Sequence, residues 1–353
     1  MPWQNREETE RSLRRKCHAD RDVPLQWDPF KPEQKHLRVN RMKKVILDVD
    51  TGIDDALALV YALRSPELEV LGITTCFGNH TVEQTTKNTL KVLELLNRTD
   101  IPVAKGAREP VFRRNDKGPS SFHGSDGLAC APLPEPKAEP ADEHAADFIV
   151  RMVRAYPHEV TLIPVGPLTN LALAVMKDPS IARLVKNVTL MGGAVFHPGN
   201  YTPVAEANIY ADPEAAELVF RSGMPVTMVG LDVTMKTLLP RSVLEEWRKI
   251  GTPLGRFLTH ITEFYMDAYL KFYPSIGGCA LHDPLAVGAV IDPSFVKTER
   301  LYVQVDTEGE ISKGRTVADL RPGHPEPNVD VCTEVDAERF LRHFLDRMNR
   351  PGS

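Results

Sequence analysis

Residues 44–63 read KVILDVDTGIDDALALVYAL and place four aspartates within eight positions, between two strongly apolar runs. The run 44–49 is typical of a buried strand, and 54–65 has the apolar spacing of a buried helix. Carboxylates beside a core repel one another and are costly to bury unless a partner neutralises them. This stretch therefore requires a neutralising group at the end of its strand.

The same alternation of short β-branched runs and helical stretches continues along the chain. Strands are expected at 44–49, 68–77, 159–166, 187–193 and 224–230, and helices at 54–65, 81–97, 168–176 and 212–223. This order predicts an α/β fold with an open, mostly parallel, doubly wound sheet flanked by helices. Polar clusters follow the strands directly, so we expect the active site at the carboxyl ends of the strands.

Composition excludes several classes of protein. The 353 residues carry a formal net charge of -5, which gives no basic footprint for nucleic acid. No apolar run has the length of a membrane span. The five cysteines are scattered without a C-x-x-C pair, which favours reduced thiols in a cytoplasmic protein. A small-molecule substrate is the expected partner.

Two segments stand apart from the repeating pattern. Residues 1–41 are rich in charge and lack apolar periodicity, so we expect a disordered extension or sequence outside the native fold, followed by one catalytic domain at 42–348. Residues 106–140 are rich in glycine, proline and charge. Their length predicts a mobile surface loop or a lid rather than an ordinary connection.

The motif DVDTGIDD, residues 48–55, is compatible with more than one kind of site. An EF-hand calcium loop is excluded, because Gly52, Ile53 and Leu59 stand where that loop needs an oxygen ligand, a glycine and a glutamate. A Mg²⁺-dependent phosphatase of the haloacid-dehalogenase type also carries D-x-D at a strand end. In that class Gly-Thr follows the motif, whereas Thr-Gly follows here, and this alternative stays open.

The remaining interpretation is a hard-cation site in which Asp50 and Asp55 bind the metal and Asp54 points at a ligand. Ca²⁺ takes about 6–8 oxygen ligands, so other loops must contribute to it. A helix N-cap would explain one aspartate at the start of 54–65, but it does not explain four.

Further motifs follow the aspartates in a fixed order. They are TTCFGN (74–79), VGPLTNLALA (165–174), MGGAV (191–195), GNYTPVAEANIYADPEAA (199–216) and HDPLAV (282–287). With these motifs the chain resembles the inosine–uridine nucleoside hydrolase family from residue 42 to about residue 348. The resemblance implies Ca²⁺-dependent hydrolysis of the N-glycosidic bond of ribonucleosides to free base and ribose.

The resemblance also implies a set of site residues. The implied calcium ligands are Asp50, Asp55, the main-chain carbonyl of Thr169, and Asp283. The implied ribose contacts are Asp54, Asn79, Asn200, Glu206, Asn208 and again Asp283. Since Glu206 and Asn208 lie two apart, we expect both on one side of an extended segment.

Cleavage of the ribosyl bond builds positive charge on the sugar and negative charge on the base. Asp50 is the candidate general base for water, and His282, with an ordinary pKa of about 6.5, is the candidate general acid for the leaving base. Asp48 is expected to support the metal ligands rather than to bind the metal.

The base pocket is less well defined by the sequence. Tyr265, Tyr269 and Tyr273 recur at a spacing of four, which places them on one helix face. Tyr269, Tyr273 and His123 are candidates for the pocket, with an aromatic core stripe and a solvated loop histidine as the alternatives. We expect a preference for pyrimidine nucleosides, uridine and cytidine.

One rival function shares most of these contacts, namely a non-catalytic, calcium-dependent sensor of nucleosides or sugars. The presence of both Asp50 and His282 argues against it, since binding alone needs neither a base nor an acid. By analogy with the family we expect a homodimer or homotetramer.

Overall fold

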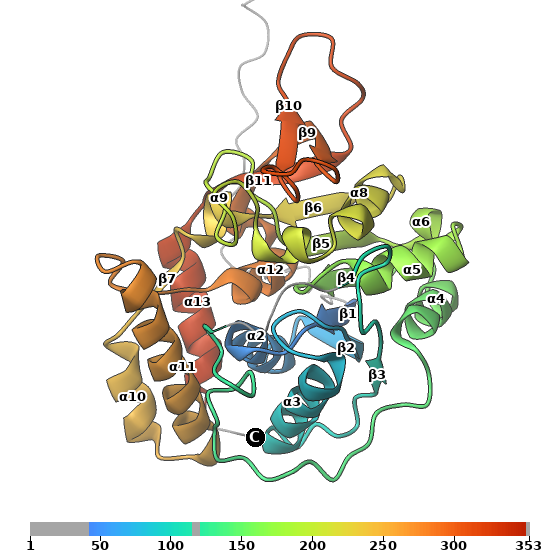
Figure 1. The fold of residues 1–353 in the computed structure, drawn as a ribbon. Coiled ribbons are helices and arrows are strands. Elements are labelled where there is room, and N and C mark those ends of the chain that lie inside the picture. Colours follow the sequence, from blue (N-terminus) through green and yellow to red (C-terminus); the bar gives the residue numbers. More distant parts are fainter. Residues whose placement is uncertain (1–41, 115–120, 351–353) are drawn as a thin grey trace, which may run out of the picture. The chain divides into compact units, whose positions relative to one another are not determined.

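The computed structural model describes residues 42–114 and 121–350, and within them nine strands form one sheet in the order β10-β9-β11-β6-β5-β4-β1-β2-β3 (Figure 1). The strands are β1 (Lys43–Val49), β2 (Leu68–Thr75), β3 (Val103–Lys105), β4 (Thr161–Pro164), β5 (Asn187–Met191), β6 (Val226–Val229), β7 (Leu238–Pro240), β8 (Gly278–Ala280), β9 (Val296–Val305), β10 (Thr316–Asp319) and β11 (Val329–Val335). Strands β7 and β8 form a separate antiparallel pair.

Helices connect most of the strands. They are α2 (Ile53–Leu63), α3 (Val82–Leu95), α4 (Ala145–Ala155), α5 (Thr169–Lys177), α6 (Ile181–Leu184), α7 (Ala207–Ala211), α8 (Pro213–Arg221), α9 (Leu231–Thr234), α10 (Val243–Ile250), α11 (Pro253–Phe272), α12 (His282–Ile291) and α13 (Ala337–Asn349), with a 3₁₀ turn η1 (Pro293–Phe295). All of the ranges expected from the sequence are found, and their ends differ by at most two residues. The predicted doubly wound α/β fold is confirmed.

The chain reverses direction across the sheet next to its first strand. Strand β1 pairs in parallel with β2 on one side and with β4 on the other. From β1 the chain goes outward to β2 and β3, and it then returns to β4 before going outward to β5 and β6 on the other side. Such a reversal is where open α/β sheets bind ligands, and here it lies at the aspartate motif.

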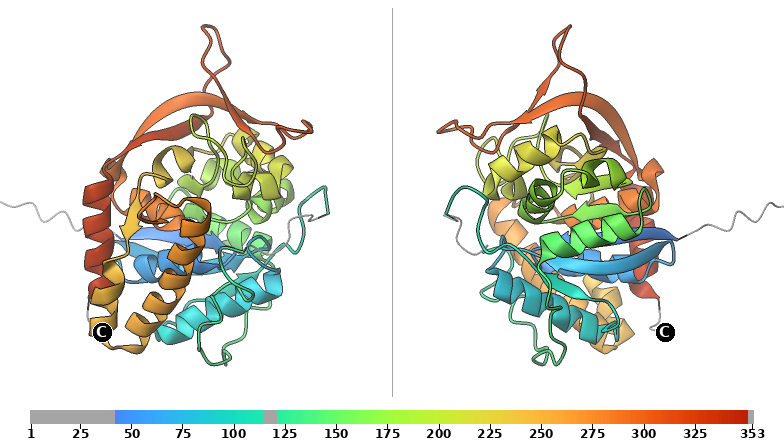
Figure 2. Two further views of the ribbon diagram at one scale, coloured as in Figure 1. Left: turned by 60° about the vertical axis from the view of Figure 1, so that its left-hand side comes forward. Right: turned by 90° about the vertical axis from the view of Figure 1, so that its right-hand side faces the viewer.

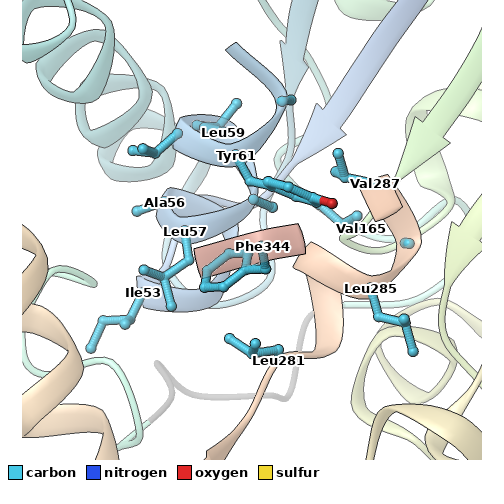
Figure 3. Close-up of a cluster of buried hydrophobic side chains, with 14 of the residues drawn as sticks. Ile53, Ala56, Leu57, Leu59, Tyr61, Val165, Leu281, Leu285, Val287 and Phe344 are labelled. Atoms are coloured by element: carbon cyan, nitrogen blue, oxygen red, sulfur yellow. The ribbon is translucent and has the colours of Figure 1, made fainter. Parts of the chain in front are cut away.

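Each face of the sheet has its own core, because successive side chains of a strand point to opposite faces. In β1, Val45, Leu47 and Val49 belong to the core with α2, α11, α12 and α13, whereas Ile46 belongs to the core with α4, α5, α6 and α8. Figure 3 shows α2 and α12 meeting Phe344 of α13 in the first core. Helix α2, which carries the aspartates at its start, is thus anchored along its length.

An antiparallel segment that the sequence did not indicate extends the sheet. Strand β11 pairs in parallel with β6, but β9 is antiparallel to both β11 and β10. Figure 2 shows the long β9 curving across this end of the sheet. This extension lies several strands away from the switch point, so it does not form the floor of the site.

No helix in residues 42–114 and 121–350 is long and apolar enough to cross a membrane. The expected N-terminal extension, residues 1–41, lies outside the described residues, as does 115–120 within the expected loop 106–140.

Candidate active site

The turn from β1 to α2 is built around Asp55. One carboxylate oxygen of Asp55 accepts the main-chain N–H of Asp50 (3.0 Å), and the other accepts that of Gly52 (3.0 Å). The Asn79 amide donates to the same carboxylate (3.1 Å). Asp55 is the third residue of α2, and its bond to the N–H of the N-cap residue Gly52 is that of a capping box, which fixes the positions of its neighbours.

Three carboxylates from two helices meet beside this turn. Asp54, Asp55 and Asp283 each place an oxygen within 4.8 Å of the others, and all three side chains are buried. Burial, followed by repulsion from neighbouring carboxylates, raises the pKa of both Asp55 and Asp283 well above the usual carboxyl range. The cluster is therefore unfavourable as bare anions.

A hard cation fits this donor set. Its members are all oxygens, and oxygens bound to one Ca²⁺ at about 2.3–2.6 Å lie at most about 5 Å apart, as these three do. A bound cation would also remove the repulsion that raises the two pKa values. The three carboxylates can hold a metal ion.

Asp50 lies next to the cluster and is 1% exposed. The main-chain N–H of Asn79 donates to its Oδ2 at 2.6 Å. Two glycines give this carboxylate its space, because a Cβ on Gly78 would lie 2.0 Å from Asp50 Oδ2 and one on Gly166 would lie 2.7 Å from Oδ1. Asp50 is thus held tightly at the end of β1.

Two further predicted residues lie deeper than the cavity. Asp48 is buried and accepts the Thr74 hydroxyl (2.6 Å) and the Asn170 amide (2.7 Å), and burial raises its pKa to about 6. Thr169 begins α5, and its hydroxyl donates to Asp212 (2.6 Å). The bonds of Asn170 to Asp48 and of Thr169 to Asp212 attach the segment after β4 to the end of β1 and to the start of α8.

All six residues expected to contact ribose line one cavity of about 370 Å³. They are Asp54, Asn79, Asn200, Glu206, Asn208 and Asp283. The cavity also reaches His123, Tyr269, Tyr273 and His282, the residues expected around the base. No lysine or arginine appears among the described lining residues. The cavity lining therefore combines carboxylates with aromatic rings, and no cationic side chain in the described lining balances the carboxylates.

The expected extended geometry of Glu206 and Asn208 is wrong. Glu206 is the N-cap of α7, and its carboxylate accepts the main-chain N–H groups of Asn208 (2.9 Å) and Ile209 (3.1 Å). Asn208 lies in the first helical turn, where its amide donates to the carbonyl of Val165 (2.7 Å). The cap supplies hydrogen bonds that an extended strand would lack, and it still leaves both residues at the cavity.

His282 lies between two hydroxyl groups. Its Nε2 is 2.6 Å from the Tyr269 phenolic oxygen, and its Nδ1 is 2.8 Å from Thr234 Oγ1. Burial lowers the pKa of His282 to about 4, well below the ordinary value expected from the sequence. Burial also raises the pKa of Tyr269 well above 10, so the phenol stays protonated.

The expectation that His123 is as readily a solvated loop residue is also wrong. The side chain is buried, its Nδ1 accepts the main-chain N–H of Ile53 at the start of α2 (3.0 Å), and its ring stacks on Tyr265. The Tyr265 hydroxyl donates to Asp54 (3.3 Å). The loop before α4 therefore closes directly onto the helix that carries the aspartates.

Several lining residues were missed by the sequence analysis, among them Phe122, Tyr201 and Met235. Phe122 packs edge-on against Tyr269, so its ring extends the group of aromatic side chains in the cavity lining. Thr234 was missed too, although it follows strand β6, and the rule that polar residues after a strand carry function would have pointed to it. For apolar side chains in loops, the sequence offers no such signal.

The fold and this site describe an α/β enzyme with an acidic, sugar-sized cavity. The model of the family "Inosine-uridine preferring nucleoside hydrolase" matches residues 45–342. The chain belongs to this family, and it is an N-glycosyl hydrolase that acts on ribonucleosides. Membership removes the phosphatase and sensor alternatives.

Individual relatives agree on the class and differ in their base preference. The pyrimidine-specific ribonucleoside hydrolase RihA of Escherichia coli O1:K1 is 40% identical over 306 residues, 86% of this chain and 97% of the relative. A solved purine-preferring ribonucleoside hydrolase from Gardnerella vaginalis is 42% identical, covers 87% of this chain and 98% of its own, and superposes with a TM-score of 0.84. The plant nucleoside hydrolase PpNRh1 is 37% identical with a TM-score of 0.83, covering 88% and 99%.

Proposed function

We propose that this protein hydrolyses the N-glycosidic bond of ribonucleosides in a Ca²⁺-dependent manner, with a preference for uridine and cytidine. One observation carries the proposal: six polar side chains suited to a ribose line the same cavity as a three-carboxylate cluster and the Tyr269–His282 pair. The two ends of the cavity suit the two halves of a nucleoside, a polyhydroxylated sugar and a flat base.

The acidic end would hold the cation and the sugar diol. We assign Asp50, Asp55, Asp283 and the Thr169 carbonyl to the cation, with Asp54 beside them. When bound, Ca²⁺ would supply positive charge that orients the ribose 2'- and 3'-hydroxyls and makes nearby water a better nucleophile. Asp50, at the end of β1, accepts the proton of the attacking water.

The side chains around the sugar lower the barrier by charge and by position. As the ribosyl bond breaks, positive charge develops on the sugar, and the carboxylates of Asp54, Glu206 and Asp283 stabilise it in a cavity whose described lining has no cationic side chain. Asn79, Asn200 and Asn208 hold hydroxyl groups, and positioning of this kind is worth at most about 7–11 kcal/mol.

The other end of the cavity handles the leaving base. The Tyr269 hydroxyl, which lies in the cavity and within hydrogen-bond distance of His282, gives its proton to the departing base as Nε2 of His282 in its protonated form passes one to the phenolic oxygen. His282 is then neutral and takes its next proton from solvent, which also receives the proton that Asp50 removes from water. The rings of Tyr269, Tyr273 and Phe122 exclude water from this end. We assign His123 to the wall that separates sugar from base.

The pyrimidine preference rests on the RihA relatives, which are pyrimidine-specific and align over 86% of this chain. The purine-preferring relative from Gardnerella vaginalis is equally similar, so base preference has to be measured. The test is the release of free base and ribose from uridine, cytidine, inosine and adenosine, in Ca²⁺-loaded and Mg²⁺-loaded protein. We expect faster hydrolysis of uridine and cytidine, with Ca²⁺. Faster hydrolysis of inosine would reverse the base assignment, and equal rates with Mg²⁺ would overturn the choice of cation.

A further inference from the structure

The short helix α9 lies between two parts of the site that belong to distant segments of the chain. It follows β6 directly and ends at Thr234, whose side chain is completely buried. Among the described residues, the Thr234 hydroxyl has one hydrogen-bond partner, Nδ1 of His282 at 2.8 Å. A buried hydroxyl with a single side-chain partner from a segment nearly fifty residues away constrains that partner's ring.

The main chain next to His282 is tied to the same turn. The N–H of Leu281 donates to the carbonyl of Thr237 (2.9 Å), and the Thr237 hydroxyl donates to the carbonyl of Thr234 (2.8 Å). The backbone before His282 and the far side of its ring are thus both attached to residues 234–237. With both ends fixed, the imidazole has one orientation in which Nε2 meets Tyr269.

The turn that holds the ring is itself firmly anchored. The Asp232 carboxylate accepts the main-chain N–H groups of Val195 (3.0 Å) and Phe196 (2.6 Å), and the N–H of Leu231 donates to the carbonyl of Gly193 (2.9 Å). These bonds join α9 to the loop that leads to Asn200 in the cavity. Groups that position catalytic side chains need this kind of rigid support.

We propose that Thr234 is a positioning residue of the reaction, whose hydroxyl holds the His282 ring so that Nε2 faces Tyr269 and the leaving base. The inference rests on the proposed role of His282 in protonating the base. Without the hydroxyl, Nδ1 would be buried without a partner, and the ring would turn away from Tyr269 to find one. The sugar end of the cavity would be unaffected, because Thr234 does not line it.

The test compares two substrates that share the ribose but differ in whether the leaving group needs a proton. Uridine needs a proton on its base, whereas p-nitrophenyl riboside releases a stable anion. For Thr234→Val we expect kcat on uridine to fall about 10- to 100-fold, the range typical for loss of a supporting hydrogen bond, while KM and the rate on p-nitrophenyl riboside change by less than about threefold. Thr234→Ser keeps the hydroxyl and should restore most of the uridine rate.

Thr259→Val is the matched control, since it removes a buried hydroxyl that donates to the main-chain carbonyl of Gly255 and that does not touch His282 or the turn at residues 234–237. Its ratio of uridine to p-nitrophenyl riboside rates should equal that of the unaltered protein. Equal losses on both substrates in Thr234→Val, or no rescue by serine, would overturn the positioning role. His282→Ala in the same assay separates the positioning role of Thr234 from the acid role of His282. If this variant also loses equal activity on both substrates, the acid role of His282 is wrong.

Discussion

The phenolic oxygen of Tyr269 lies 2.6 Å from Nε2 of His282, and both side chains line the cavity that also contains the acidic cluster. Burial keeps the imidazole neutral and the phenol protonated, because it lowers the pKa of His282 to about 4 and raises that of Tyr269. The neutral imidazole has to take up a proton before it can act as an acid, and the low pKa makes the imidazolium so formed a strong acid. It can then pass that proton to the phenol as the phenol gives its own to the departing base.

Replacing His282 by alanine should slow hydrolysis of natural nucleosides far more than hydrolysis of p-nitrophenyl riboside. General acid–base catalysis contributes about 10²- to 10⁴-fold, and an activated leaving group does not need it. Steady-state rates on uridine and on p-nitrophenyl riboside measure the difference. A similar fall on both substrates would contradict an acid role.

Tyr269→Phe removes only the hydroxyl and leaves the ring that packs on Phe122. If the phenol carries the proton, the loss on uridine should approach that of His282→Ala, with KM little changed. Tyr273→Phe is the matched comparison, since Tyr273 also lines the cavity but shares no hydrogen bond with His282 among the described residues. We expect a clearly larger loss for Tyr269→Phe, and equal losses would contradict a proton transfer through the Tyr269 phenol.

Asp50→Asn keeps the shape of the side chain and removes its ability to accept a proton. We expect uridine to bind with an affinity within about tenfold of the original while turnover falls by about 10²- to 10⁴-fold. Calorimetric binding of uridine, together with single-turnover rates, separates the two effects. Normal turnover in this variant would show that another group is the base.

Gly78→Ala should inactivate the enzyme, although Gly78 itself has no side chain that could take part in the reaction. Gly78 has a φ of +154°, and its added Cβ would lie 2.0 Å from Asp50 Oδ2, so the carboxylate has to move. A displacement of about 1 Å can cost about 10²-fold in rate. Gly223→Ala controls for backbone strain alone, because Gly223 also has a positive φ (+81°) but an added Cβ there meets nothing within 4 Å. If both variants lose activity to the same extent, displacement of Asp50 is not the cause.

Removal of the cation should destabilise the protein more at higher pH. Burial and mutual repulsion raise the pKa of Asp55 and Asp283 in the folded, cation-free protein, so it binds more protons than the unfolded chain does. Its stability therefore falls as pH rises above the ordinary carboxyl range, whereas a bound cation replaces those protons. Thermal unfolding with Ca²⁺ and with chelator should show a larger Tm difference at about pH 8 than at about pH 5.5. A Tm difference independent of pH would argue that these carboxylates do not bind the ion.

Much of this architecture could be predicted because it depends on local pattern. The β1 run and the apolar spacing after it predict a strand and a helix, and parallel strand ends share one edge, so the aspartates, Asn79 and Asn170 had to come together there. The capping bonds of Asp55 follow from its place in the first turn of α2.

Most of what was missed depends on contacts between distant segments. The burial of His123 against Tyr265 and the bond from Thr234 to His282 each join parts of the chain that no local pattern relates. The pKa of His282 is a further example, since its lowering comes from complete burial that the motif HDPLAV does not reveal. The helical cap at Glu206 is local instead, and it was missed because a spacing of two residues was interpreted as an extended segment.

The most direct test of the account is a titration of Ca²⁺ into fully chelated protein, with binding and uridine hydrolysis followed in the same samples. We predict that chelated protein releases no uracil, and that hydrolysis returns in proportion to the binding of one Ca²⁺ per chain. Full hydrolysis in the chelated protein, or Ca²⁺ binding that restores none, would contradict the assignment of the buried aspartates to a catalytic cation.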